Sequence, residues 1–124
     1  MKLTRTMAVV AWAGILGAAA PEMTAGEFLE RMEKAESLGP AAILSSDARS
    51  LRTESDRVRE RYIADLAKQK ASGTARHSCP PGDGKPKLSG DELRNYLVKL
   101  TPAQKKQPFR LAVYSLMKQK YPCK

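Results

Sequence analysis

The sequence predicts a small all-α protein, a bundle of about four helices closed by one disulfide. Residue patterns typical of helix starts recur at three positions, each a Ser or Thr followed three residues later by Glu or Gln. Apolar residues recur at the spacing of amphipathic helices, and no segment shows the alternation of a half-buried strand. Together these observations place the chain in the all-α class.

The first residues have the layout of a secretory signal peptide. A basic start precedes an uncharged, largely apolar run over residues 7–16, and small residues follow. The run is too short for a membrane-spanning helix, which needs about 20 residues. We expect cleavage after Ala19, so that residues 1–19 are the signal and residues 20–124 form a single helical domain without a stable membrane anchor. The alternative is an ordinary buried apolar helix.

The first helix of the domain is expected over residues 25–37. Thr24 can cap this helix, and Glu27 can reach back to the cap. Met23 can pack against Phe28 at the offsets of a hydrophobic staple. This start is therefore marked by several residues that agree.

A long helix is expected over residues 47–71, after a short helical turn at residues 40–46. Its apolar residues recur at helical spacing and form one narrow stripe, so the helix should lie on the surface with one side packed. The members of the stripe are Leu51, Val58, Tyr62 and Leu66. Residues 72–88 contain glycines and prolines without apolar periodicity and should form a loop.

Two further helices are expected after this loop. The first covers residues 90–100, with Ser89 as its cap and Glu92 reaching back to that cap. A capped turn at residues 101–104 comes next. The last helix should begin at Pro108, because a proline in the middle of a helix costs about 3 kcal/mol.

The two cysteines, Cys79 and Cys123, belong to a chain that we expect to be exported to a compartment where thiols oxidise. A disulfide between them would close a unit over residues 79–123, a loop of about 45 residues, and chain entropy alone would give it roughly 4 kcal/mol. We expect this disulfide, with an unpaired thiol or an intermolecular bridge as the alternatives.

The composition and the motifs favour a binding protein over an enzyme. The formal net charge is +9 at pH 7, but export and the mixed charges of the long helix argue against a nucleic-acid partner. One histidine, His77, and two cysteines are too few for a zinc site. The carboxylates lie in helix caps or on charged helix faces. We therefore expect no catalytic residues, no metal and no cofactor.

The loop around the first cysteine is the candidate binding segment. It is fixed at Cys79 and rich in glycine and proline, so it can protrude while its base stays in place. Its charged residues Lys85, Lys87 and Asp83 are the candidates for contact with another protein. The simpler explanation of the lysines is that they keep the protein soluble. Pairing of two copies of the chain as a homodimer is a further alternative.

The stretch between the cysteines reads "CPPGDGKPKLSGDELRNYLVKLTPAQKKQPFRLAVYSLMKQKYPC". A cysteine followed by proline opens it, a helix ending in Tyr-Leu follows, and a proline-containing turn leads to a helix that closes in Tyr-Pro-Cys. This stretch resembles the C-terminal half of the Rap/Tai family of immunity proteins, and "RYIADL" at residues 61–66 is similar to the family's Tyr-Ile segment. The family's usual glycines there, and a further upstream cysteine, are absent. The resemblance covers residues 61–123.

Members of that family are small periplasmic helical proteins. In bacteria with type VI secretion they bind and block cell-wall-degrading effectors such as amidases. The resemblance therefore implies a disulfide-closed helical fold, a location in the periplasm of a Gram-negative bacterium and a secreted cell-wall hydrolase as the partner. It implies no effector-contacting residues, since those differ with each toxin. The alternative is a periplasmic acid-stress chaperone of the HdeA type, or a general envelope protein. An acid-stress chaperone acts at low pH, where the loss of carboxylate charge would leave this chain strongly positive.

Overall fold

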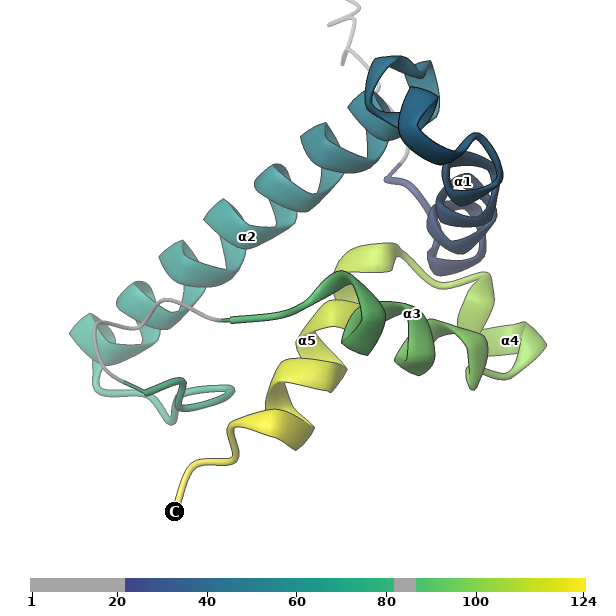
Figure 1. Ribbon diagram of the computed structural model, residues 1–124. Helices are drawn as coiled ribbons and strands as arrows, with labels where there is room; N and C mark the ends of the chain where they lie inside the picture. Colours follow the sequence, from purple (N-terminus) through teal and green to yellow (C-terminus); the bar gives the residue numbers. More distant parts are fainter. Residues whose placement is uncertain (1–21, 82–86) are drawn as a thin grey trace, which may run out of the picture.

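The computed structural model describes residues 22–81 and 87–124. These residues form helices and one isolated bridge but no strand, so the predicted all-α class is confirmed (Figure 1). The elements in chain order are α1 (Ala25–Ser37), the 3-10 helix η1 (Gly39–Leu44), α2 (Ser46–Ser72), α3 (Gly90–Val98), α4 (Pro102–Lys105) and α5 (Phe109–Lys120).

The predicted signal peptide, residues 1–19, lies outside the described residues. In the part of the chain that the structure does describe, no helix has the length and apolar character needed to cross a membrane.

The helix starts follow the predicted caps. The backbone N–H of Glu27 donates to Thr24 Oγ1 at 3.1 Å, and the backbone N–H of Thr24 donates to Glu27 Oε2 at 3.2 Å. Thr101 and Gln104 form the same reciprocal pair at 2.9 and 3.2 Å. The second pair makes the predicted turn a short helix of its own, α4.

The cap of α3 differs from the prediction. Ser89 Oγ accepts from the backbone N–H of Glu92 at 3.1 Å, as expected. The Glu92 carboxylate, however, binds Lys120 Nζ on α5 at 2.7 Å. A charged donor offers a carboxylate a stronger hydrogen bond than a backbone N–H does. The side chain predicted to serve the cap therefore links two helices, and α3 ends at Val98 rather than at residue 100.

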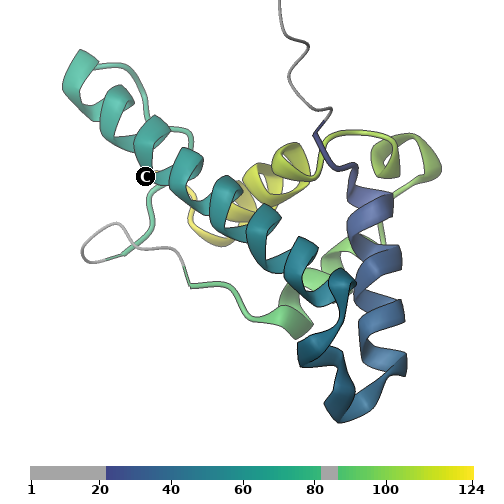
Figure 2. The same ribbon diagram turned by 90° about the horizontal axis from the view of Figure 1, so that it is seen from above.

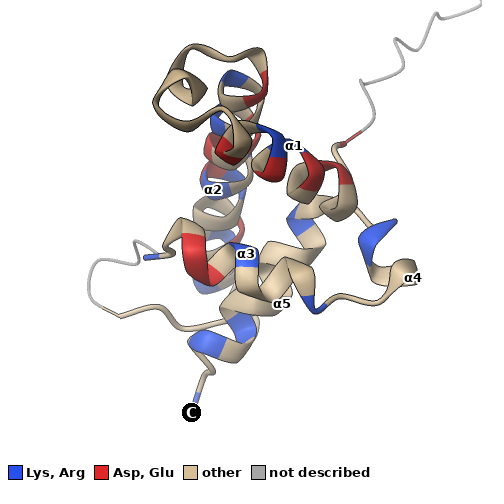
Figure 3. Ribbon diagram, turned by 45° about the vertical axis from the view of Figure 1, so that its right-hand side comes forward, with Lys and Arg blue, Asp and Glu red and all other residues tan. Residues whose placement is uncertain are grey.

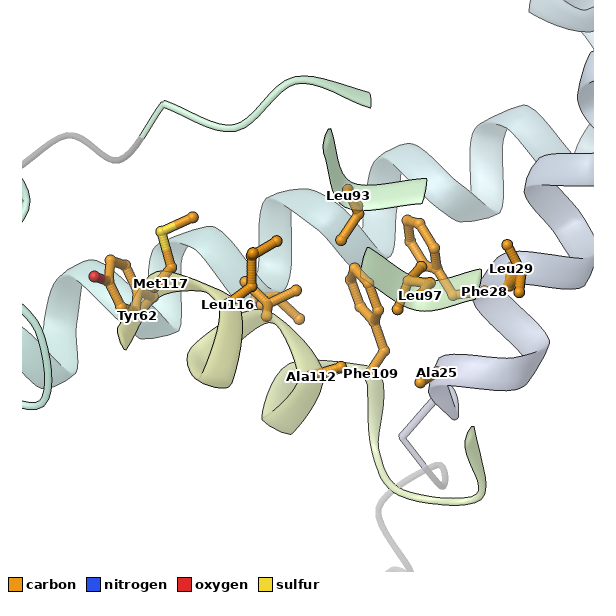
Figure 4. Close-up of a cluster of buried hydrophobic side chains, with 12 residues drawn as sticks. Ala25, Phe28, Leu29, Tyr62, Leu93, Leu97, Phe109, Ala112, Leu116 and Met117 are labelled. Atoms are coloured by element: carbon orange, nitrogen blue, oxygen red, sulfur yellow. The ribbon is translucent and has the colours of Figure 1, made fainter. Parts of the chain in front are cut away.

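The core is one apolar cluster that joins α1, α3 and α5 to a stripe of α2 (Figure 4). Phe28 and Phe109 stack with ring centroids 3.7 Å apart at the end near α1, and Met117 lies beside Tyr62 at the other end. Of the predicted α2 stripe, Val58 and Tyr62 are buried, and Leu51 and Leu66 pack against the cluster. The narrow stripe thus holds a long, otherwise charged helix to the core.

A short backbone contact joins the start of α1 to the start of α5. The N–H of Ala25 donates to the carbonyl of Gln107 at 2.9 Å, and the N–H of Phe109 donates to the carbonyl of Met23 at 2.8 Å. Sequence patterns give no sign of this contact, because so short a pairing leaves no alternation to detect.

The disulfide between Cys79 and Cys123 is confirmed, with Cα atoms 5.0 Å apart. The backbone N–H of Cys79 also donates to the carbonyl of Tyr121 at 2.7 Å. The bond therefore fixes the end of α5 to the segment that follows α2. Such a disulfide is typical of proteins in oxidising, extracytoplasmic compartments.

The helices α1 and α2 are joined at a corner formed by η1, and the second half of α2 runs away from α1 (Figure 2). This divergence leaves one side of α2 facing α5 and the segment before α3. The candidate site lies there.

Candidate functional site

A groove of about 640 Å³ lies between α2, α5 and the segment that leads into α3. Its volume is within the range of ligand pockets, about 300–1,000 Å³. The apolar residues that line it are Val58, Tyr62, Leu88, Leu93, Phe109, Val113 and Met117. The polar residues that line it are Ser55, Arg59, Lys87, Ser89, Glu92 and Lys120.

Each helical wall of the groove presents a pair of apolar residues one turn apart. On α2 the pair is Val58 and Tyr62, and on α5 it is Val113 and Met117. Residues four apart in a helix lie on the same face, one above the other. These four residues are only 1–9% exposed and belong to the core, so they form the buried floor of the groove.

The rim of the groove carries more positive than negative charge. Arg59 comes from α2, Lys87 precedes α3 and Lys120 comes from the end of α5. Lys120 binds Glu92, the only carboxylate among the described residues of the lining. This hydrogen bond, more than any other factor, raises the pKa of Lys120. Arg59 and Lys87 form no ion pair with any other residue that the structure describes.

The chain segment that includes α3, α4 and α5 is also positively charged, like the rim of the groove. From Lys87 to Lys124 the chain has nine basic and two acidic residues. Acidic residues instead gather on α1, which has four glutamates against two basic residues (Figure 3). The groove therefore opens on the basic side of an electrostatically uneven protein, which favours an acidic partner.

The structure places one of the three predicted contact residues at this site. Lys87 lies on the rim, whereas Lys85 and Asp83 lie outside the described residues. Sequence reasoning missed Arg59 and the groove itself. The floor of the groove consists of residues that the periodicity correctly assigns to packed helix faces, but periodicity does not show how the helices are placed relative to one another.

A polar cluster fixes the base of the loop beside the groove. The hydroxyls of Tyr62 and Ser78, both buried, hydrogen-bond to each other. The His77 ring packs on Tyr114, with ring centroids 5.4 Å apart, and the Tyr114 hydroxyl donates to Asp65 Oδ2 at 2.6 Å. Burial and this hydrogen bond raise the pKa of Tyr114, so it stays a donor at physiological pH.

Replacing Tyr62 by phenylalanine should lower the free energy of unfolding by about 1–3 kcal/mol, because it removes the hydroxyl partner of the buried Ser78. Urea unfolding followed by circular dichroism measures the change. The double variant Tyr62→Phe/Ser78→Ala should recover part of the loss, since neither hydroxyl is then left without its partner. Strictly additive losses would show that the two hydroxyls do not stabilise each other.

Stability should also depend on the protonation of His77. Burial, and secondarily the charge of Lys118, holds the pKa of His77 below its ordinary value. The unfolded chain then binds this proton more readily than the folded protein, so stability should fall as the pH drops below about 6.5. Thermal unfolding measured from about pH 7.5 to about 5 should show a flatter pH dependence for His77→Gln than for the wild type. Equal slopes would contradict the assignment.

The burial of Glu54 differs from the sequence prediction. It was expected on a charged, solvated helix face, but it is only 7% exposed. Arg57 binds both of its carboxylate oxygens, at 2.8 and 2.6 Å. This two-point contact compensates for burial of the charge. Within residues 22–81 and 87–124, no three or more His, Cys, Asp or Glu side chains are grouped so as to hold a metal ion.

An exposed apolar surface lies at the corner between α1 and α2. Leu38, Ile43 and Leu44 there are 49%, 71% and 83% exposed. No charged residue occurs from Leu38 to Ser46. This surface gives no indication of a partner's chemistry, whereas the groove has a basic rim.

Comparisons of the chain with known protein families, with curated proteins and with solved structures found no match.

Proposed function

We propose that this protein is a non-catalytic binding protein of an oxidising, extracytoplasmic compartment, and that it blocks a partner protein through the groove between α2 and α5. The observation that carries the proposal is the groove itself, which has an apolar floor and a rim with the exposed basic residues Arg59 and Lys87. Protein interfaces combine an apolar, well-packed centre with a polar rim in the same way. The disulfide and the shared core hold the walls in place, which lowers the entropy cost of binding.

The partner that we propose is a secreted cell-wall hydrolase. The support for this class is the resemblance of residues 61–123 to immunity proteins that block such effectors, together with the small, disulfide-closed helical fold. Inhibition of this kind requires steric blockage and no chemistry from the inhibitor. A basic rim suits an acidic surface on the hydrolase, because complementary charge speeds association and selects the partner.

The domain of residues 20–124 should inhibit the cell-wall hydrolase encoded beside its own gene. The assay follows the loss of turbidity of purified peptidoglycan at increasing inhibitor concentration. Reversing two rim charges with Arg59→Glu and Lys87→Glu should weaken inhibition at least about tenfold, because attraction becomes repulsion at the edge of the interface. Both side chains are exposed, so the variant should fold normally.

The matched control is Arg49→Glu with Lys106→Glu. This variant changes the net charge equally, but its residues are exposed and do not line the groove. It should inhibit like the wild type, and equal weakening of both variants would trace the effect to net charge alone. Failure to inhibit any neighbouring hydrolase would contradict the proposed function. Protection of unrelated proteins from aggregation at about pH 2–3, where carboxylates are protonated, would instead favour the chaperone alternative.

A further inference from the structure

We infer that lysines at the ends of α3, α4 and α5 form a further binding surface, which holds the protein reversibly against a membrane that contains anionic phospholipids. This surface, the lysine face, consists of Lys99, Lys105, Lys106 and Lys118. None of the four residues lines the groove, so the inference is independent of the proposed function.

The last quarter of the chain has charge of one sign only. From Leu93 to Lys124 there are eight basic residues and no acidic residue. The charges of α2, in contrast, are mixed, with seven basic and five acidic residues. Figure 3 shows acidic segments on α1, on α2 and at the start of α3, but only basic ones on α4 and α5. Such an unbalanced region attracts an anionic surface over about 10 Å at 0.1 M salt.

Helix stability explains only part of this pattern. The helix dipole favours basic residues in the last turn of a helix and acidic residues in the first turn. The first turns of α1, α2 and α3 have acidic residues, whereas those of α4 and α5 have none. The dipole therefore accounts for the lysines at the helix ends but not for the missing acidic residues. Attraction of an anionic surface accounts for both.

The basic residues that stay without an ion pair in this region are all lysines. Arg94 contacts Glu36 at 3.3 Å. Arg110 contacts Glu22 at 3.1 Å, and Lys120 is paired as described above. The residues of the lysine face form no ion pair with any other residue that the structure describes. Their ammonium groups are therefore free to contact an external anion.

The lysine face surrounds one hollow of the molecule. This hollow, of about 660 Å³, lies between α3, α4 and the end of α5, and its lining includes Lys99, Gln104 and Gln119. Lys105 and Lys118 are the chain neighbours of the two glutamines. Lysine carries its charge on a flexible four-carbon stem. Ammonium groups from three elements can therefore contact one surface that covers the hollow.

The composition of this region favours lipid headgroups over other anionic partners. Protein interfaces are enriched in arginine and aromatic residues and depleted of lysine, and single-stranded nucleic acids stack on exposed aromatic rings. Here the unpaired charges are lysines, and none of the four aromatic residues between Leu93 and Lys124 is exposed. Anionic headgroups require only charge, and each lysine near such a surface strengthens binding roughly fivefold.

Vesicle sedimentation with the domain of residues 20–124 tests the inference. In about 50 mM salt, vesicles with about 30% phosphatidylglycerol should bind the domain at least about tenfold more strongly than vesicles of phosphatidylcholine alone. Raising the salt to about 500 mM should release the domain, because salt screens the lysines from the headgroups. Both results are obtained with the wild-type protein and do not depend on the folding of a variant.

Charge reversal then locates the surface. The variant Lys99→Glu/Lys118→Glu should bind the anionic vesicles at least about tenfold more weakly. The matched control, Arg52→Glu/Lys68→Glu on α2, changes the net charge equally and should lose no more than about threefold. All four side chains are exposed, so both variants should fold normally, which circular dichroism checks.

Equal weakening of the two variants would trace vesicle binding to net charge alone and overturn the inference. Equal binding of both kinds of vesicle, or no binding at about 2 mM lipid, would also overturn it. Stronger binding of polyglutamate than of anionic vesicles, at equal anion concentration, would assign the lysine face to an acidic protein instead. None of these results bears on the proposed function, because inhibition of the hydrolase is measured without membranes.

Discussion

Replacing both Cys79 and Cys123 by serine should lower the free energy of unfolding by about 2–4 kcal/mol. The sequence separation of the cysteines is 44 residues, so the disulfide removes many conformations from the unfolded chain. The loss is large for a domain of this size, whose whole stability is about 5–15 kcal/mol. Urea unfolding followed by far-ultraviolet circular dichroism should show a lower midpoint.

Reduction provides the control for the disulfide variant. Wild-type protein unfolded in the presence of reductant should lose about the same stability as the double serine variant, because both remove the same link. The variant itself should not respond to reductant. A loss below about 1 kcal/mol in both cases would show that the link constrains the unfolded chain far less than its loop length indicates.

Replacing Phe109 by alanine should cost about 3–5 kcal/mol. Phe109 is 1% exposed, stacks on Phe28, and lies where the backbone of α5 pairs with Met23 before α1. Removing its ring leaves a cavity among three helices, and the disulfide at the other end of α5 does not allow that helix to shift freely into the space. Thermal unfolding should show the lower stability directly.

The matched control for Phe109 is Leu111→Ala on the same helix. Leu111 is 40% exposed, and leucine and alanine both favour helices. This variant should change stability by no more than about 0.5 kcal/mol. If Phe109→Ala cost no more than Leu111→Ala, the stacked pair would not be the centre of the core.

Local signals explain what could be predicted from the sequence. The predicted first helix, residues 25–37, agrees with α1 because its start depends on Thr24 and Glu27, which are only three residues apart. The long helix was also placed closely, since α2 spans Ser46–Ser72. The pairing of the cysteines had no intramolecular alternative once both were expected to oxidise.

The features that could not be predicted depend on how separate elements meet. The groove depends on how α2, α5 and the segment before α3 are placed, and apolar periodicity gives the buried face of each helix but not their relative position. The Glu92 carboxylate binds Lys120 instead of the cap of its own helix, because α5 brings that lysine within 2.7 Å. Lys87 lies on the rim and was predicted as a contact residue from the composition of its loop, and its contact with a partner stays a prediction. Arg59, also on the rim, has no sequence signal that sets it apart from the other charges of its helix.

Lysine footprinting tests most directly that the groove is the binding surface. The domain is treated with a limiting amine-reactive reagent, alone and in complex with the neighbouring hydrolase, and the modification of each lysine is measured by mass spectrometry. Lys87, on the rim, should lose most of its reactivity in the complex. Lys99 and Lys106, which are exposed and do not line the groove, should keep theirs. Unchanged reactivity of Lys87 in a complex that protects Lys99 or Lys106 would contradict this account.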